Sequence, residues 1–253
     1  MADETLPGAP APIVTVPSGS PAETGVMPLF DHLNELRSRI FRSVLAVLVA
    51  SGFGWFAATT VRNYLLDQLP GHKAQVLGPG DAFFIQIKIS LTIGVILAMP
   101  VLLYQLWAFI APGLTQAERK TIRPWIPLAL LLFAIGVGIA YLVLPFAIAF
   151  LLGFTDNQLV NGIAATPYFD FVTTLFLAFG LIMEFPIVLY GLSLVGVISS
   201  AWMSKNRRMI ILGIVAFSAI ITPGGDLVSP TVLAITMYVL TELTRITIKR
   251  SGR

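Results

Sequence analysis

Six apolar segments dominate the chain, at about residues 40–61, 83–110, 125–154, 171–198, 209–221 and 228–240. A helix needs about 20 apolar residues to cross a bilayer, and each of the first four segments is that long. The last two hold thirteen residues each, and a helix of that length rises only ~20 Å. The pattern predicts an all-α integral membrane protein with six transmembrane helices, the last two short. Short spans require a thinner bilayer or snorkelling ends, and re-entrant helices are the open alternative.

Prolines and one acid interrupt two of the long segments. Segment 125–154 is longer than the ~30 Å apolar core requires, so we expect Pro145 to kink or end its spanning part. Glu184 is the only charged residue of segment 171–198. A charge at the centre of a membrane helix costs about 2.5–3.5 kcal/mol, and acids kept there are usually functional. The alternative is a structural acid that is hydrogen-bonded to a neighbouring helix. Pro186 cannot donate to the carbonyl four residues earlier, which weakens the helix beside this acid.

The distribution of lysine and arginine predicts the orientation. These residues gather before the first segment, in loops 111–124 and 199–208, and after the last segment. Loop 61–82 holds two of them, and loops 155–170 and 222–227 hold none. By the positive-inside rule, both termini are cytoplasmic. The same rule accounts for the net charge of +3 without a nucleic-acid partner.

Composition supports a membrane domain with short flanking regions. Hydrophobic residues make up 56% of the chain and charged residues 11%, against about 25% charged in soluble domains. The absence of cysteine excludes disulfides and thiolate metal sites. Residues 1–27 form a Pro-rich tail that we expect to be disordered and that lacks the regions of a cleavable signal peptide. Residues 28–248 form the membrane domain, and 249–253 a basic C-terminal end.

Two acids stand on the predicted cytoplasmic side. Glu35 and Arg39 are spaced i, i+4 on a helix that also carries the apolar stripe Leu33, Leu36, Ile40. This helix either anchors topology at the interface or offers Glu35 to a basic partner. Glu118 follows Thr115 at the spacing of a capping box, so it caps a helix or makes a similar acidic contact.

Other polar residues suggest rival functions. Asp226, in the TPGGD turn, is expected to cap the last helix or the turn. A proton-coupled secondary transporter could use Lys88, Glu184 and Asp226 as a relay, although the chain lacks the internal repeats of such proteins. An intramembrane protease is not supported, because no histidine lies in an apolar segment and no H-E-x-x-H motif occurs. A structural membrane scaffold is the third alternative.

Taken in order, several motifs make the chain resemble the TatC family, the multi-spanning core of the twin-arginine protein translocase. The resemblance covers about residues 28–248 and rests on HLNELRSR, DAFFIQIK, PVLLYQLWAFIAPGLTQAERK, FGLIMEFPIV and TPGGD. It implies a protein that is not an enzyme and uses no cofactor. It implies binding of the twin-arginine signal peptides of folded precursors on the cytoplasmic face of a bacterial or thylakoid-type membrane. It further implies partners of the single-span TatA and TatB kind, assembly into a multimeric export complex, and transport driven by the proton motive force.

The resemblance also implies site residues. Glu35 and Glu118 match the acidic signal-peptide site of the family, and Arg37, Gln105 and Phe109 match its neighbours. The guanidinium group supports this physically, because each arginine of a pair presents a planar fork that a carboxylate accepts bidentately.

Two further acids have counterparts in the family. Glu184 matches its intramembrane acid and Asp226 its acid before the last helix, which suggests polar contacts for a partner inside the bilayer. Family members often carry a proline before this second acid, where the chain has Gly225. The family also ends in two short helices.

Overall fold

The computed structural model describes residues 29–113, 115–116, 119, 124–154, 162–222 and 225–250, with side chains from residue 32 onward. The predicted tail 1–27 lies outside these residues. The described part is helical, with one isolated bridge between Gln75 and Ala164 and no strand. The prediction of an all-α membrane protein is confirmed.

Five helical stretches are long and apolar enough to cross a membrane. They are α1 (Leu29–Leu66), α2 (Asp81–Ile110), α4 (Trp125–Leu152), α5 (Ala165–Ile182) continued by α6 (Phe185–Leu194), and α9 (Val228–Arg250). Shorter helices complete the described chain: η1 (Pro70–His72), η2 (Ala111–Gly113), α7 (Ser200–Lys205) and α8 (Arg207–Ile221). Helix α8 has 15 residues and corresponds to the fifth apolar segment.

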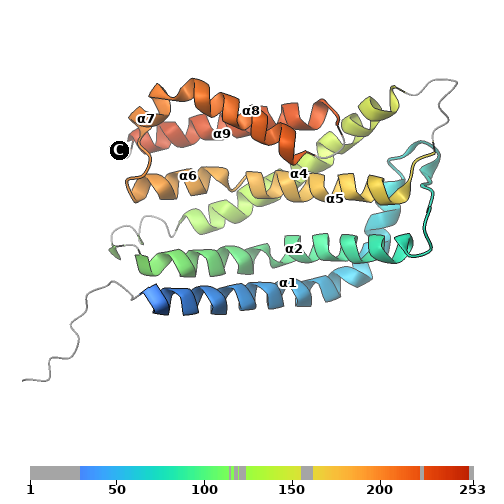
Figure 1. Cartoon of the computed structure of the whole chain (residues 1–253), viewed down its shortest axis with the longest axis horizontal. Helices are drawn as coiled ribbons and strands as arrows, with labels where there is room; N and C mark the ends of the chain where they lie inside the picture. The colour runs from blue at the N-terminus through green and yellow to red at the C-terminus, as the bar shows by residue number, and fades with distance from the viewer. Residues whose placement is uncertain are drawn as a thin grey trace, which may run out of the picture.

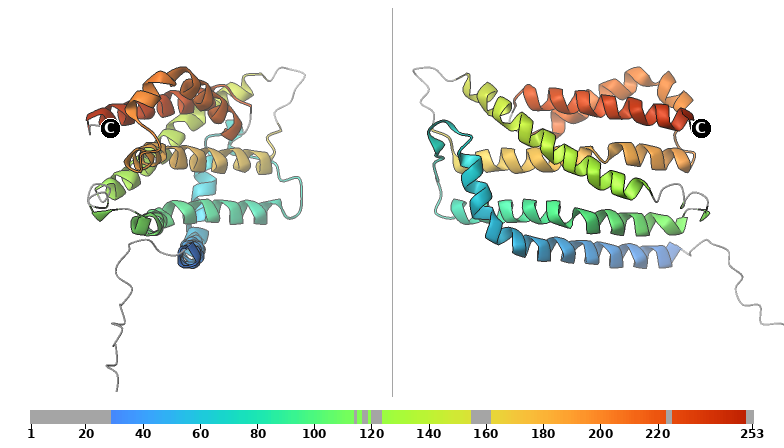
Figure 2. Two further views of the ribbon diagram at one scale, coloured as in Figure 1. Left: turned by 60° about the vertical axis from the view of Figure 1, so that its left-hand side comes forward. Right: turned by 180° about the vertical axis from the view of Figure 1, so that it is seen from behind.

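The helices form an elongated bundle (Figure 1). Helices α1 and α2 lie side by side at one edge, and the α8–α9 hairpin lies at the other edge. Between them, α5 and α6 run nearly in line, and α4 crosses obliquely. Turned views show that the last turns of α1 bend toward the rest of the bundle (Figure 2). The hydroxyl of Tyr168 on α5 donates to the carbonyl of Leu65 at this bent end, at 2.6 Å.

Small residues set the helix contacts in the bundle. A Cβ atom added to Gly94 on α2 would lie 2.7 Å from the backbone nitrogen of Ser51 on α1. A Cβ added to Gly136 on α4 would lie 2.6 Å from Met183 Cγ and 3.0 Å from the Cα of Gly180. Close backbone approach at small residues is the usual way in which membrane helices pack, because lipid supplies no hydrophobic drive between them.

The central helix is α5, and α1 is the most peripheral span. In the most apolar window of each span, 56% of the α5–α6 residues are buried against 11% in α1. Phe169, Leu175 and Phe179 of α5 are among the largest fully buried side chains. The α5–α6 span, which contains Glu184, is therefore the one around which the other helices pack.

Pro145 does not end the third span, contrary to one of the two outcomes expected for it. Helix α4 continues through Pro145 to Leu152, as α2 continues through Pro100 to Ile110. In a packed membrane bundle, neighbouring helices and local adjustments compensate the freed backbone group. The oblique course of α4 accommodates its extra length, as tilt does for long membrane helices (Figure 1).

The last helix is longer than its apolar segment. Helix α9 continues to Arg250 because its polar half is stabilised locally. The hydroxyls of Thr241, Thr244 and Thr247 each donate to the carbonyl four residues earlier. The Arg245 guanidinium donates to both carboxylate oxygens of Glu242 across one turn, at 2.6 and 3.1 Å. The count of apolar residues therefore underestimated the length of this helix.

Candidate functional site

A polar cluster lies where α1 begins and α2 ends, since these antiparallel helices bring their opposite ends together. Arg39 connects it: Nη2 donates to Glu35 Oε1 at 3.0 Å and Nη1 donates to Gln105 Oε1 at 3.0 Å. Gln105 is buried, and the side chains of Glu35 and Arg39 are 18% and 21% exposed. The predicted i, i+4 pair is confirmed, and Gln105 fixes it to the second helix.

One carboxylate oxygen of the cluster is unsatisfied. Glu35 Oε2 is buried and has no hydrogen-bond partner among the described residues. A buried acceptor without a partner carries a desolvation penalty of about 1–3 kcal/mol. The cluster thus holds Glu35 in a fixed orientation, with one buried oxygen that no described residue satisfies.

An aromatic pair borders this cluster. His32 stacks on Phe109 with ring centroids 4.4 Å apart and an interplanar angle of 16°. His32, Glu35 and Arg39 are spaced i, i+3, i+7, so they form one stripe of α1 that faces α2. The family resemblance implied Phe109 as a site residue but not His32. The i, i+3, i+7 spacing of His32, Glu35 and Arg39 is the sequence signal that indicates His32.

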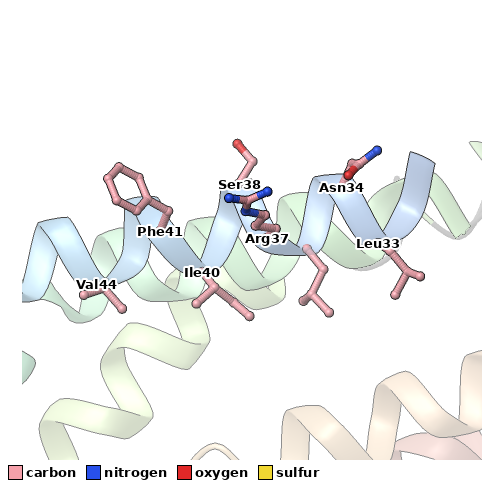
Figure 3. Close-up of a pocket in the computed structure, with 8 residues that line it drawn as sticks. Leu33, Asn34, Arg37, Ser38, Ile40, Phe41 and Val44 are labelled. Carbon is pink, nitrogen blue, oxygen red and sulfur yellow. The ribbon is translucent and has the colours of Figure 1, made fainter. Parts of the chain in front are cut away.

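The apolar stripe of α1 lies about 100° around the helix from this polar stripe, because each of its residues follows a polar one. Leu33 and Ile40 are 59% and 54% exposed. Together with Phe41 and Val44 they line a shallow depression on the outer surface of the helix (Figure 3). In a membrane this is the expected arrangement, because lipid solvates the apolar side chains and the polar ones turn toward the neighbouring helix.

Arg37 does not belong to the Glu35 cluster. Its side chain is exposed and lines the same outer depression, with Asn34 and Ser38 as neighbours (Figure 3). Two residues along a helix turn the side chain by about 200°, so Arg37 and Glu35 point to different faces. Arg37 is therefore close to Glu35 in sequence but lies on another face of α1, and its role in peptide binding stays a prediction.

Glu118 lies outside the described residues. Near it, the Arg119 amide donates to the Thr115 carbonyl at 2.9 Å, which is the bond of a helical turn. The connection after α2 begins at η2, next to Phe109 in sequence. The second acid of the predicted site is therefore carried by the segment that leaves the cluster.

Glu184 stands at a break in the central helix. Helix α5 ends at Ile182 and α6 begins at Phe185. At the joint, the Glu184 amide bonds to the Leu181 carbonyl at 3.1 Å, a tighter i to i−3 contact. The predicted weakening by Pro186 is confirmed. The Oε1 atom of Glu184 is buried and has no partner among the described residues.

Asp226 is a helix cap, as expected. Its Oδ2 accepts a hydrogen bond from the Ser229 amide at 2.6 Å, at the start of α9. The side chain is 4% exposed, and Oδ1 is buried with no partner in the described part of the chain. Helix α9 starts at the end of the bundle away from the beginning of α1, so Asp226 and Glu35 are far apart (Figure 1).

Lys88 pairs with an acid that the sequence did not single out. Its ammonium group forms an ion pair with Asp170 on α5. In the next turn of each helix, the Thr92 hydroxyl donates to the Lys88 carbonyl and the Thr173 hydroxyl donates to the Asp170 carbonyl. Lys88 therefore pairs with neither acid of the hypothetical proton relay.

The fold and these clusters define a polytopic helical membrane protein with a polar patch at one end of the bundle. Residues 31–235 match the family described as Sec-independent protein translocase protein (TatC). The chain belongs to the TatC family. It is accordingly a multi-pass membrane component of the Sec-independent translocase and not an enzyme.

Individual relatives agree over most of the chain. A TatC protein of Aquifex aeolicus is 39% identical over 228 residues, covering 86% of this chain and 92% of the relative. A TatC protein of Carboxydothermus hydrogenoformans is 34% identical over 220 residues, covering 86% and 90%. A crystal structure entitled as the twin arginine translocase receptor TatC superposes with a TM-score of 0.74 at 38% identity, covering 88% of this chain and all (100%) of that one.

Proposed function

We propose that the chain binds the twin-arginine signal peptides of folded precursors at the Glu35 cluster, on the cytoplasmic face. The observation that carries this proposal is the buried Oε2 of Glu35, which lacks a partner among the described residues while Oε1 is held by Arg39. An incoming guanidinium supplies the missing donor. Glu118, on the segment that leaves the cluster, supplies the carboxylate for the second arginine.

Charge and geometry support this assignment. Glu35 and Arg39 form a neutral pair, so the net charge attraction for the arginine pair of the peptide comes from Glu118. A guanidinium offers five donors in a planar fork, and a carboxylate accepts two of them at once. The His32–Phe109 stack provides an apolar surface beside the acid, against which the hydrophobic part of a signal peptide packs.

The same proposal covers assembly and topology. We assign both termini to the cytoplasm, because the start of α1, the end of α9 and the basic α7–α8 junction lie at one end of the bundle (Figure 1). Helix α8 completes six spans, and its 15 residues rise ~22 Å, which requires a thinned bilayer. The bound peptide nucleates a multimeric export complex with single-span TatA-like and TatB-like partners, driven by the proton motive force.

Glu184 and Asp226 provide polar contacts for these partners. Each has a buried carboxylate oxygen without a partner among the described residues. Intramembrane acids are costly and usually mark functional sites, which supports a contact between these acids and a second molecule.

The experiment is photocrosslinking of a twin-arginine peptide to the full chain in nanodiscs. Glu35→Ala combined with Glu118→Ala is expected to weaken binding by about a hundredfold or more, because two charge-assisted contacts of about 1.5–3 kcal/mol are lost. Asp67→Ala, which removes an exposed acid after the far end of α1, serves as the matched control and leaves binding unchanged.

A second peptide sharpens the assignment. Replacing its arginine pair with lysines keeps the charge but removes the fork, so it binds about tenfold more weakly. Undiminished crosslinking in the double variant, or equal affinity for both peptides, contradicts carboxylate recognition at this patch.

A further inference from the structure

The ion pair of Lys88 and Asp170 joins two helices that carry almost no other charge. Lys88 is the only charged residue of α2 after Asp81, and Asp170 is the only charged residue of α5. Lys88 lies ~10 Å along α2 from Asp81, and Asp170 lies ~8 Å along α5 from Ala165. A charge in an apolar segment is costly unless it is paired, so each side chain compensates the other. Neither peptide recognition nor the contacts proposed for the unpaired acids use this pair.

The pair lies at the end of the bundle away from the Glu35 cluster (Figure 1). Helices α1 and α2 form a hairpin, residues 29–113, which carries that cluster and which we call the peptide hairpin. Every hydrogen bond or ion pair that joins described residues of the hairpin to residues 124–250 lies at this far end. They are the Lys88–Asp170 pair, the Tyr168 hydroxyl on the Leu65 carbonyl at 2.6 Å, the backbone bonds of Gln75 to Ile163 and Ala165 at 2.7 and 2.8 Å, and the contact of the Tyr64 and Tyr141 hydroxyls.

Toward the Glu35 cluster, the hairpin meets the bundle through apolar side chains. Met99 and Leu103 of α2 are buried against Ala129 and Phe133 of α4, and Ile187 of α6 packs on the same cluster. Such contacts repack more readily than a directed ion pair, provided that volume is conserved. The contacts within the Glu35 cluster join only α1 to α2. The position of the hairpin on the bundle is therefore set from its far end.

Among these hydrogen bonds and ion pairs, only the Lys88–Asp170 pair connects α2 directly to α5. Helix α5 is fixed by the core, since Phe169, Leu175 and Phe179 are fully buried. Its span continues to Glu184 at the α5–α6 break, and α2 continues to the Glu35 cluster. The ion pair thus fixes the register between the helix that holds half of the peptide site and the span that holds Glu184.

We propose that Lys88 and Asp170 are positioning residues, which keep the peptide hairpin in register with the α5–α6 span and so place the bound signal peptide relative to Glu184. The inference rests on the proposed function, because it names the contact that joins the peptide site to the proposed partner site. Peptide affinity depends on contacts within the hairpin and does not require the pair. Export requires both sites in one arrangement and therefore does require it.

Removing one partner and removing both have different effects. Lys88→Met or Asp170→Leu leaves a lone charge in an apolar segment, so each lowers the melting temperature. The double variant Lys88→Met/Asp170→Leu restores the melting temperature, because an apolar pair often replaces an ion pair without loss of stability. It lacks a directed contact, so export stays about tenfold below wild type. The charge swap Lys88→Asp/Asp170→Lys restores both stability and export.

The register itself is measured by double electron–electron resonance on the full chain in nanodiscs, since the sequence contains no native cysteine. Spin labels at Leu48→Cys on α1 and Val188→Cys on α6, at positions 59% and 50% exposed, report the distance from the hairpin to the α5–α6 span. The apolar double variant is expected to broaden this distance distribution, and the charge swap to restore it. Labels at Leu48→Cys and Leu106→Cys, both within the hairpin, are the matched control and keep their distance in every variant.

Peptide affinity, measured by isothermal titration, stays within about twofold in all variants, because distant sites act additively. Wild-type export by the apolar double variant indicates a structural role only and overturns the inference. A charge swap that folds normally but does not restore export also overturns it. If the swap does not fold, Lys88→Arg keeps the ion pair and serves as the rescue variant, and loss of export there contradicts the inference. Absence of peptide binding by the wild type contradicts the proposed function instead, whereas the distance measurement tests the ion pair by itself.

Discussion

Glu35 and Glu184 each keep one buried carboxylate oxygen without a partner in the described chain, but their surroundings differ. Glu35 sits on a continuous helix, and Arg39 holds its other oxygen and links it to Gln105 on α2. Glu184 sits at the α5–α6 break with no ion pair among the described residues.

In our proposal, this difference in orientation distinguishes the acid that binds the peptide from the acid that contacts a partner helix. A carboxylate that is already oriented by an arginine and an amide is preorganised to accept one more donor in a fixed direction. No described arginine or amide holds the Glu184 carboxylate in this way. Its unpaired buried oxygen would gain a hydrogen bond from a donor on a partner. The comparison supports the proposal that the peptide binds at the end of α1 and that partner helices contact the interior acid.

The largest predicted loss of stability comes from two glycines at close helix contacts, one between α1 and α2 and one between α4 and α5. Gly94→Leu drives a side chain into the Ser51 backbone, and Gly136→Leu drives one into Met183 and Gly180. Each is expected to destabilise the bundle by about 3 kcal/mol, because backbone cannot yield as a flexible side chain does. Thermal unfolding in detergent measures this, with Gly138→Leu on α4 as the control, because no atom lies within 4 Å of a Cβ built there. A melting temperature unchanged by Gly94→Leu contradicts the close α1–α2 contact that places Gln105 beside Arg39.

The second prediction separates the two acids functionally. Glu184→Leu leaves peptide affinity within about twofold, because the α5–α6 break lies away from the Glu35 cluster and additivity holds for distant sites. It is expected to reduce export and partner crosslinking severely, because the polar contact inside the bilayer is lost. Glu184→Gln, which keeps the size and hydrogen-bonding capacity, retains more export than the leucine variant. Wild-type export by Glu184→Leu removes the assembly role.

Much of this contrast could be predicted from the sequence. The apolar segments predicted the helices, and Pro186 predicted the break beside Glu184 because a missing amide has a local effect. The i, i+4 spacing predicted the Glu35–Arg39 pair, and the position of Asp226 before α9 predicted its cap. Each of these features depends on residues within one turn of each other.

Local sequence patterns did not predict the features that depend on contacts between helices; only the family resemblance grouped Gln105 and Phe109 with Glu35. The polar stripe of α1 faces the bundle. This is known only from its contacts with α2, namely Arg39 with Gln105 and His32 with Phe109. The Asp170 partner of Lys88 lies on another helix, and no local pattern links them. Helix α9 runs beyond its apolar segment because polar side chains bond within it and pack at the end of the bundle.

The smallest predicted effect concerns the aromatic border of the Glu35 cluster. His32→Ala removes the stack on Phe109, which is worth about 0.5–1.5 kcal/mol for a ring pair. The stack exists with and without peptide, so its loss mainly lowers the stability of the bundle. Peptide affinity is expected to fall by about threefold through the lost apolar surface, while the Arg39 contacts to Glu35 and Gln105 remain. His32→Phe keeps a ring at this position and restores affinity, whereas Leu33→Ala on the exposed outer stripe leaves it unchanged. Isothermal titration with a twin-arginine peptide distinguishes these outcomes. Equal losses in His32→Ala and Leu33→Ala indicate that the peptide binds the outer depression of α1 rather than the α1–α2 cluster.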